Sequence, residues 1–321
     1  MRYGLPYLGS KNAIARWIID NLPKADTFCD LFFGGGAVTH AGLLSGKYKH
    51  FIVNDIDARL PKLFLECAYG KHTTDTHPEW ISREEFFRRK DEDAYIALVW
   101  SFGNNGKSYI YGADIEPFKH DYHRAVYEDD TSLLEPWGYK ISSSHFESVY
   151  DRYIEFNRQI KQTTPSALLE VATRQIEIER LQSLQSLQSL QSLQSLQSLQ
   201  SYGTSFERVP IPEGALIYCD IPYYNTNCGK YDGFDHETFY QWALQQDNIF
   251  ISEYSMPSCF IEVANTEKVI LSSASGNGDK AVERIYTNRR TYDRMSQHQK
   301  DIIATNRAVQ VSLFDYNPYQ E

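Results

Sequence analysis

Apolar and polar positions near the start of the chain predict a strand–helix–strand unit. Apolar residues recur at helical spacing over 12–22, which indicates an amphipathic helix. A short apolar run over 28–33 predicts a strand, and three glycines after it lead into a second helix. Residues 51–53 predict the next strand, which ends at Asn54 and Asp55. This order of elements is typical of nucleotide-binding α/β folds.

The pattern changes in the middle of the chain and returns near its end. Strands are predicted over 215–219 and 248–255, with a helix over 236–246 between them, and residues 308–314 alternate like a final strand. Residues 61–164 show no strand–helix alternation; they hold short helical stretches, many aromatic and charged residues, and an Asn/Gly-rich loop. We therefore interpret residues 61–164 as an inserted module.

A tandem repeat separates this module from the second α/β segment. Leu-Gln-Ser occurs seven times without interruption over 181–201. Thr164 and Pro165 form a helix start, and Leu and Gln favour helices, so we predict one long helix over 165–204. Leucines at every third position drift around an α-helix but align in one stripe on a 3₁₀-helix. Base rates favour the α-helix and the pattern favours the 3₁₀-helix, with lengths of about 32 Å and about 42 Å.

Three hypotheses for the repeat remain open. The first is a tolerated low-complexity spacer. The second is an apolar stripe that packs on the inserted module and acts as a ruler, so that a gained or lost triplet shifts the module. The third is self-association through the leucines.

Composition excludes several classes of protein. The chain has 321 residues, 42% of them hydrophobic, and a formal net charge of −10, which argues against coating nucleic acid by charge alone. No apolar run approaches the roughly 18–20 residues of a membrane span, and the N-terminus is too polar for a signal peptide. Five scattered cysteines fit a reducing cytoplasm. Without CxxC or HExxH spacing, no metal site is expected.

Three motifs are candidates for chemistry. The glycines of FFGGGAV (32–38) allow a close backbone approach to a ligand, although a tight packing turn is an equal interpretation. Asp55 lies where a carboxylate can bind a ribose diol; its rival Asp57 is interpreted as a helix cap. DIPYY (220–224) follows a predicted strand directly. There an acid, a backbone carbonyl and an aromatic ring can hold a planar base, with a β-turn as the alternative.

Together these motifs resemble the Dam-like class of DNA adenine-N6 methyltransferases. The resemblance rests on YLGSK at 7–11, FxGxG at 32–36, Asp55 and a DPPY-like tetrad that begins at Asp220. ISEYS, ERIYTN and the loop FGNNGKSYIYG match further family segments. The resemblance covers nearly the whole chain and keeps the family's motif order.

The resemblance implies a fold and a cofactor. The fold would be an α/β, Rossmann-like methyltransferase core of residues 1–60 and 205–321, with a mainly helical DNA-recognition region over 61–164 and the repeat helix over 165–204. The cofactor would be S-adenosyl-L-methionine. The residues implied to contact it or to order its pocket are Tyr7, Lys11, Phe32, Gly34, Gly36, Asp55 and Asp220.

The resemblance also implies a catalytic tetrad, made here of Asp220, Ile221, Pro222 and Tyr223. Asp220 and the Ile221 carbonyl would accept the amino hydrogens of a flipped-out adenine, and Tyr223 would stack on the base. The family usually has Pro where this chain has Ile221. Because Ile also has a carbonyl, the tetrad loses a φ constraint but keeps its acceptor.

Double-stranded DNA is the implied partner, in a restriction–modification setting. Two basic clusters, over 83–90 and 284–294, are candidate DNA faces, with solvated helix surfaces as the alternative. The positions expected to contact DNA are Asn104, Asn105, Lys107 and Tyr109 in the Asn/Gly-rich loop, and Arg289 and Arg290 in the second cluster.

Other functions remain open. A nicotinamide-dependent oxidoreductase would use the glycine turn and Asp55 but leaves DIPYY and YLGSK unexplained. A non-catalytic DNA-binding relic of a methylase fits the acidic charge and Ile221. Methylation of RNA or of cytosine N4 is a third alternative.

Overall fold

A computed structural model describes residues 2–143, 145–163, 174–223, 233–270, 279–301 and 303. The chain forms two compact units. The sheet unit contains residues 16–33, 45–56 and 198–321. The helical unit contains residues 1–15, 34–44 and 57–197. The N-terminal stretch expected in the core, residues 1–60, is thus shared by both units.

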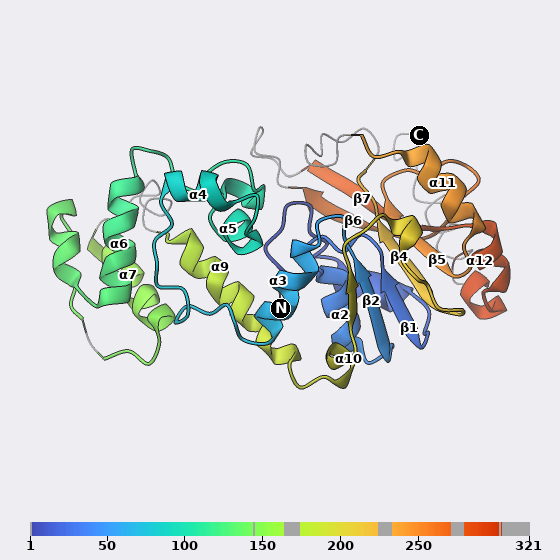
Figure 1. The fold of residues 1–321 in the computed structure, drawn as a ribbon, viewed down its shortest axis with the longest axis horizontal. Helices are drawn as coiled ribbons and strands as arrows, with labels where there is room; N and C mark the ends of the chain where they lie inside the picture. Colours follow the sequence, from blue (N-terminus) through green and yellow to red (C-terminus); the bar gives the residue numbers. More distant parts are fainter. Residues whose placement is uncertain are drawn as a thin grey trace, which may run out of the picture. The chain divides into compact units, whose positions relative to one another are not determined.

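Within the described residues, the sheet unit is built on a seven-stranded sheet of order β3-β2-β1-β4-β5-β7-β6. Figure 1 shows the strands as arrows. The strands are β1 (Thr27–Asp30), β2 (His50–Asn54), β3 (Gln200–Tyr202), β4 (Leu216–Asp220), β5 (Ile249–Glu253), β6 (Ile261–Ile270) and β7 (Asp279–Thr287). Strands β3, β2, β1, β4 and β5 pair in parallel, whereas β7 is antiparallel to both β5 and β6. The predicted α/β class is confirmed.

Uninterrupted apolar runs explain the central strands, because a parallel strand covered on both faces needs apolar side chains throughout. Cys29 in β1, Ile217 in β4 and Ile251 in β5 are fully buried in one core. The predicted strands over 51–53 and 215–219 correspond to β2 and β4. The strand predicted over 308–314 lies outside the described residues.

Two helices complete the C-terminal part of the sheet unit. They are α11 (His236–Gln245), which confirms the predicted helix, and α12 (Arg289–Arg294). Asn288 caps α12 by accepting the Thr291 amide at 2.8 Å. Its side-chain amide donates to the Ala243 and Gln246 carbonyls, both at 2.7 Å, and so attaches α12 to the end of α11. The described residues of this unit also contain α1 (Ala15–Asn21) and the 3₁₀-helix η4 (Phe206–Arg208).

The helical unit is made mainly of short helices. They are α2 (Ala37–Ser45), α3 (Arg59–Ala68), α4 (Arg83–Arg89), α5 (Ala94–Val99), η1 (Phe102–Asn104), α6 (Glu116–Glu128), η2 (Thr131–Trp137), α7 (Val149–Thr163), α9 (Ile176–Gln185), η3 (Ser186–Leu190) and α10 (Gln194–Gln197). One core of this unit joins α6, α7 and α9 through Tyr122, Phe156 and Ile178, all fully buried.

Helix α9 is held by two charged residues, the buried Glu177 and the half-buried Arg180. Glu177 accepts the Tyr111 hydroxyl, and its other oxygen lies 3.1 Å from His123 Nδ1. Arg180 donates to three carbonyls at the end of α5, at 3.2, 2.6 and 2.7 Å. Because the last carbonyls of a helix lack partners within it, a guanidinium there stabilises α5 as well. These contacts set the position at which the repeat begins.

The prediction of one long repeat helix is wrong. The repeat starts in α9, continues as the 3₁₀-helix η3, passes through α10, and ends as β3, which pairs with β2. The change from α to 3₁₀ follows from the spacing. Leu181 and Leu184 can share one buried side of α9, but further leucines at three-residue intervals would turn away from it. The tighter 3.0-residue turn of η3 keeps Leu187 and Leu190 buried as well.

The first four leucines of the repeat are core residues of the helical unit. Leu181, Leu184, Leu187 and Leu190 are all fully buried. Helix α9 packs on α3, α5 and α7, and η3 packs on α3. These leucines are therefore not available as a stripe for self-association. The Thr164–Pro165 helix start lies outside the described residues.

Candidate functional site

The carboxyl ends of the parallel strands carry a row of acids. Asp30 ends β1, Asp220 ends β4 and Glu253 ends β5, and Asp55 directly follows β2. Glu283 lies in β7, one residue before Arg284, which pairs with Glu253. Since β1 connects onward to β2 but also borders β4, this edge contains the switch point at which α/β sheets bind ligands.

Most of these acids are removed from water. Asp30, Asp55, Glu253 and Glu283 are all buried, and Asp220 is half-buried. Buried carboxylates favour a cationic or hydrogen-bonding ligand, because their charge is otherwise costly. Sequence reasoning assigned roles to Asp55 and Asp220 only. Asp30 and Glu253 fall inside the predicted strands 28–33 and 248–255, whereas β1 and β5 end at these two residues, so the predicted bounds concealed their position.

Asn54 organises the backbone around Asp55. Its side-chain amide donates to the Leu31 carbonyl at 3.1 Å and to the Thr204 carbonyl at 3.0 Å, and its oxygen accepts the Thr204 amide at 3.1 Å. The Asn54 backbone carbonyl accepts the Phe33 amide at 2.9 Å. One buried side chain thus ties the end of β1, the end of β2 and the chain after the repeat together, a role that sequence reasoning missed.

The tetrad residues occupy different environments. The Ile221 side chain is buried in the core of the sheet unit. The Pro222 carbonyl lies 2.7 Å from His236 Nε2 at the start of α11. The Tyr223 hydroxyl donates to Glu283 at 2.6 Å. Burial and the charges of Asp220 and Glu283 raise the pKa of Tyr223 well above its usual value, so its hydroxyl remains a donor. Tyr224 lies outside the described residues.

Phe32 belongs to an aromatic cluster of the sheet unit. Its ring lies 5.6 Å from Phe206 and 5.7 Å from both Phe234 and Phe239. The pairs with Phe234 and Phe239 are edge to face, which is a favourable packing arrangement. The cluster holds the chain just after β1 beside the start of α11.

Within the helical unit, the N-terminal segment packs on the glycine turn. The Leu5 amide donates to the Gly35 carbonyl at 2.7 Å. The Tyr7 side chain covers both Gly34 and Gly35, and a Cβ at Gly35 would come within 2.8 Å of Tyr7 Cβ. Only glycine allows this approach, and Gly36 has a φ of +69°, which favours glycine as well. The structure therefore brings YLGSK and the glycine turn together.

The predicted cofactor residues are divided between the units. Tyr7, Gly34 and Gly36 belong to the helical unit, together with Lys11, which is buried. Phe32, Asp55 and Asp220 belong to the sheet unit.

His40 anchors the N-terminal segment to α2. Its Nδ1 accepts the Gly4 amide at 3.0 Å, and the ring is buried. Burial lowers the pKa of His40 to about 4, below the value of about 6.5 expected in the unfolded chain. The unfolded state therefore takes up a proton first as the pH falls, and stability is lost between about pH 6.5 and pH 4.

We predict that this titration destabilises the protein in acid. Lowering the pH from 6.5 to 5.5 should cost about 1 kcal/mol through His40, measured as the free energy of unfolding in urea. His40→Asn keeps an acceptor but cannot titrate, so it should show a shallower pH dependence by that amount. Parallel curves for the two proteins would contradict the prediction.

In the Asn/Gly-rich loop, three of the side chains predicted to contact DNA form hydrogen bonds with backbone groups of the protein. Asn104 has a φ of +57° and donates to the Leu98 carbonyl at 2.9 Å. The Asn105 side chain accepts the amides of Lys107 and Ser108, at 2.8 and 3.2 Å. Tyr109 is buried, and its hydroxyl donates to the Ile81 carbonyl at 2.7 Å. Lys107 is exposed.

The basic cluster on α12 is exposed but partly neutralised. Arg290 pairs with Asp247 at 3.2 Å, and Arg294 pairs with the same carboxylate at 2.8 Å. Arg289 lies 3.9 Å from Asp293, with both side chains largely exposed. Exposed pairs of this kind contribute little to stability, so these guanidinium groups can exchange partners.

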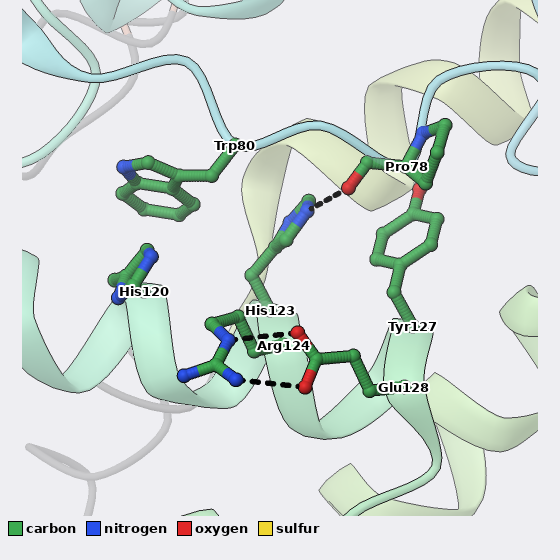
Figure 2. A pocket seen from close by; sticks show the side chains of 7 residues that line it. All are labelled: Pro78, Trp80, His120, His123, Arg124, Tyr127 and Glu128. Carbon is green, nitrogen blue, oxygen red and sulfur yellow. Dashed lines mark hydrogen bonds and ion pairs between the residues drawn. The ribbon is translucent and has the colours of Figure 1, made fainter.

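The helical unit also contains a pocket of about 360 Å³ (Figure 2). It is lined by Pro78, Trp80, His120, His123, Arg124, Tyr127 and Glu128. His123 Nε2 lies 2.9 Å from the Pro78 carbonyl. Arg124 donates from Nε and Nη2 to the two carboxylate oxygens of Glu128, at 2.7 and 2.8 Å. Aromatic rings and the Arg124–Glu128 ion pair are thus among its lining groups. None of these residues was predicted as functional.

Two further features concern metals and membranes. Across the described residues, no three His, Cys, Asp or Glu side chains gather so that they could bind a metal ion. None of the helices in the described ranges has the length and apolarity needed to cross a membrane.

Comparison with known proteins gives one assignment. Residues 7–255 match the sequence profile described as the D12 class N6 adenine-specific DNA methyltransferases. The match covers well over half of the chain and includes both the glycine turn and the tetrad. No curated protein matches the chain significantly.

Proposed function

The chain belongs to the D12 class N6 adenine-specific DNA methyltransferase family, and from this premise we propose that it methylates a flipped-out adenine with S-adenosylmethionine as donor. The observation that carries the proposal is the position of Asp220. It ends β4 at the switch point of the sheet, between the acids that follow β1 and β2 on one side and those of β5 and β7 on the other.

The acidic residues at the strand ends fit this cofactor. S-adenosylmethionine, when bound, supplies an electrophilic methyl group on a positively charged sulfur. A row of buried carboxylates at the strand ends offers a cation a favourable environment. Asp55, at the end of β2, can accept hydrogen bonds from the ribose diol. The cofactor roles that the family resemblance implies for Tyr7, Lys11, Gly34 and Gly36 remain predictions.

Asp220 and the Ile221 carbonyl would activate the adenine amino group. The amino nitrogen is a poor nucleophile because its lone pair is delocalised into the ring. Two acceptors that bind the amino hydrogens return electron density to the nitrogen. The Ile221 side chain, buried in the core, would hold that carbonyl in place of the usual proline. Most of the acceleration would come from positioning in a preorganised site.

We further propose that exposed lysine and arginine side chains contact DNA. Lys107 is exposed on the Asn/Gly-rich loop, and Arg289 and Arg290 are exposed on α12. These cations would bind phosphates. Asn104 and Asn105 would act mainly by fixing the conformation of the loop that carries Lys107. Tyr109 would anchor the same loop through its hydrogen bond to the Ile81 carbonyl. Residues 61–164 would form the recognition region.

A ligand-binding experiment tests the cofactor assignment. We expect S-adenosylhomocysteine to raise the melting temperature, because a ligand that binds only the folded state stabilises it. At 100 times its dissociation constant the gain is about 2.7 kcal/mol. NAD serves as the control and should produce no shift. Stabilisation by NAD alone would instead support an oxidoreductase.

A transfer assay tests the reaction. Tritium from labelled S-adenosylmethionine should appear in mixed-sequence DNA. Long-read modification sequencing should then locate the methyl group on adenine N6 within one recognition sequence. Cofactor binding without any transfer would support the non-catalytic alternative.

A further inference from the structure

Tyr223 of the tetrad is held by a residue far along the chain. Its hydroxyl donates to Glu283 Oε2 at 2.6 Å. Glu283 lies in β7 and is 1% exposed. A hydrogen bond to a carboxylate is among the stronger kinds. The sequence does not indicate this contact, because 60 positions separate Tyr223 from Glu283.

Tyr254 and Arg284 constrain the ring of Tyr223 as well. Tyr254 meets the Tyr223 ring edge to face, with centroids 4.5 Å apart. Arg284, next to Glu283, donates to the Tyr254 carbonyl at 2.7 Å and pairs with Glu262 at 3.1 Å. Strand β7 thus fixes the ring of Tyr223 through its hydroxyl and also holds the residue that packs against it.

This arrangement leads to an assignment that rests on the proposed function. We propose that Glu283 is a positioning residue for methyl transfer: by accepting the Tyr223 hydroxyl, it fixes the plane on which the target adenine stacks. Tyr223 follows Asp220 by three residues, so a fixed ring also sets where the base lies relative to the acid. Loss of the anchor would leave Asp220 and the cofactor site intact but would allow the ring to turn.

Three variants separate this role from a general structural one. Glu283→Leu removes the acceptor, and Tyr223→Phe removes the donor. Glu283→Gln keeps a carbonyl oxygen that can accept the hydroxyl. We expect the first two to lower kcat/KM on DNA by about 10- to 100-fold, the range expected for a hydrogen bond to a charged group. Glu283→Gln should recover most of that loss.

The contact should also appear as coupling. The double variant Glu283→Leu/Tyr223→Phe should be no worse than either single variant, because both remove the same interaction. Tyr202→Phe is the matched control: it deletes a hydroxyl of the sheet unit that makes only a 3.4 Å contact with Gln200. We expect it to leave turnover unchanged.

A binding readout distinguishes positioning from folding. The probe is a duplex with 2-aminopurine at the adenine mapped for the unmodified protein, whose fluorescence reports the flipped base. Glu283→Leu should change this fluorescence, whereas its thermal shift with S-adenosylhomocysteine should stay normal. Additive losses in the double variant, or full turnover in Tyr223→Phe, would overturn the assignment. If Glu283→Leu fails to fold, Tyr223→Phe and Glu283→Gln still decide it. Absence of methylation by the unmodified protein would instead refute the proposed function.

Discussion

Asp220→Ala is expected to abolish methylation while the protein stays folded. The substitution removes an acceptor of the adenine amino group, and preorganised hydrogen-bonding groups of this kind contribute about 10²- to 10³-fold or more in rate. Asp220 is half-buried at the end of β4, where its backbone still pairs with β5, so the sheet should survive. Tritium transfer to DNA measures the loss, and circular dichroism checks the fold.

Asp293→Ala provides the matched control for this experiment. Asp293 is an exposed acid of the same unit on α12, 3.9 Å from Arg289. Its removal deletes one negative charge without touching the strand ends, so turnover should stay close to normal. Full turnover in Asp220→Ala would remove the basis for the whole site, whereas equal losses in both variants would indicate a general effect of charge.

Leu187→Ala is expected to destabilise the protein by about 2–5 kcal/mol, the range for buried leucines. Leu187 is fully buried in η3, which packs on α3. Because the repeat contains chemically identical units, it supplies its own control. Leu199→Ala makes the same change at a half-buried position after α10, where the cost should stay within about 1 kcal/mol.

The free energy of unfolding in urea compares the two variants. A large cost for Leu187 alone would show that the first half of the repeat is core and that the spacer hypothesis applies at most to the residues after η3. Similar small costs for both leucines would mean that the repeat is a tolerated spacer throughout.

The local sequence pattern predicted secondary structure well where adjacent residues determine it. Apolar runs that end in an acid or a glycine turn located β1, β2, β4 and β5, because a strand buried on both faces must be apolar along its length. The motif order was sufficient to indicate the family, and the profile match confirms it. The cofactor and tetrad residues remain predictions at the level of individual contacts.

Strands β6 and β7 could not be predicted in the same way. Residues 261–270 mix polar and apolar positions. Among the described residues β6 lies at the edge of the sheet and pairs with β7 alone, and edge strands have weak patterns. Glu283 therefore had no recognisable setting in the sequence, although its segment had been matched to the family.

The Asn/Gly-rich loop shows a second limit. Its composition predicts a loop, and the structure contains the short 3₁₀-helix η1 within it. Whether an asparagine faces DNA or its own backbone depends on the fold, and here Asn104 and Asn105 bind backbone groups within the helical unit. Residue type alone does not distinguish the two uses.

The repeat shows most clearly where local information runs out. Seven identical units adopt an α-helix, a 3₁₀-helix and a strand, so the conformation of each unit is set by its neighbours in space. A strand end, a glycine turn and a motif can be read from adjacent residues, because their physical causes are local. The partner of a buried carboxylate, and the form that a three-residue period takes, depend on groups that only folding brings together.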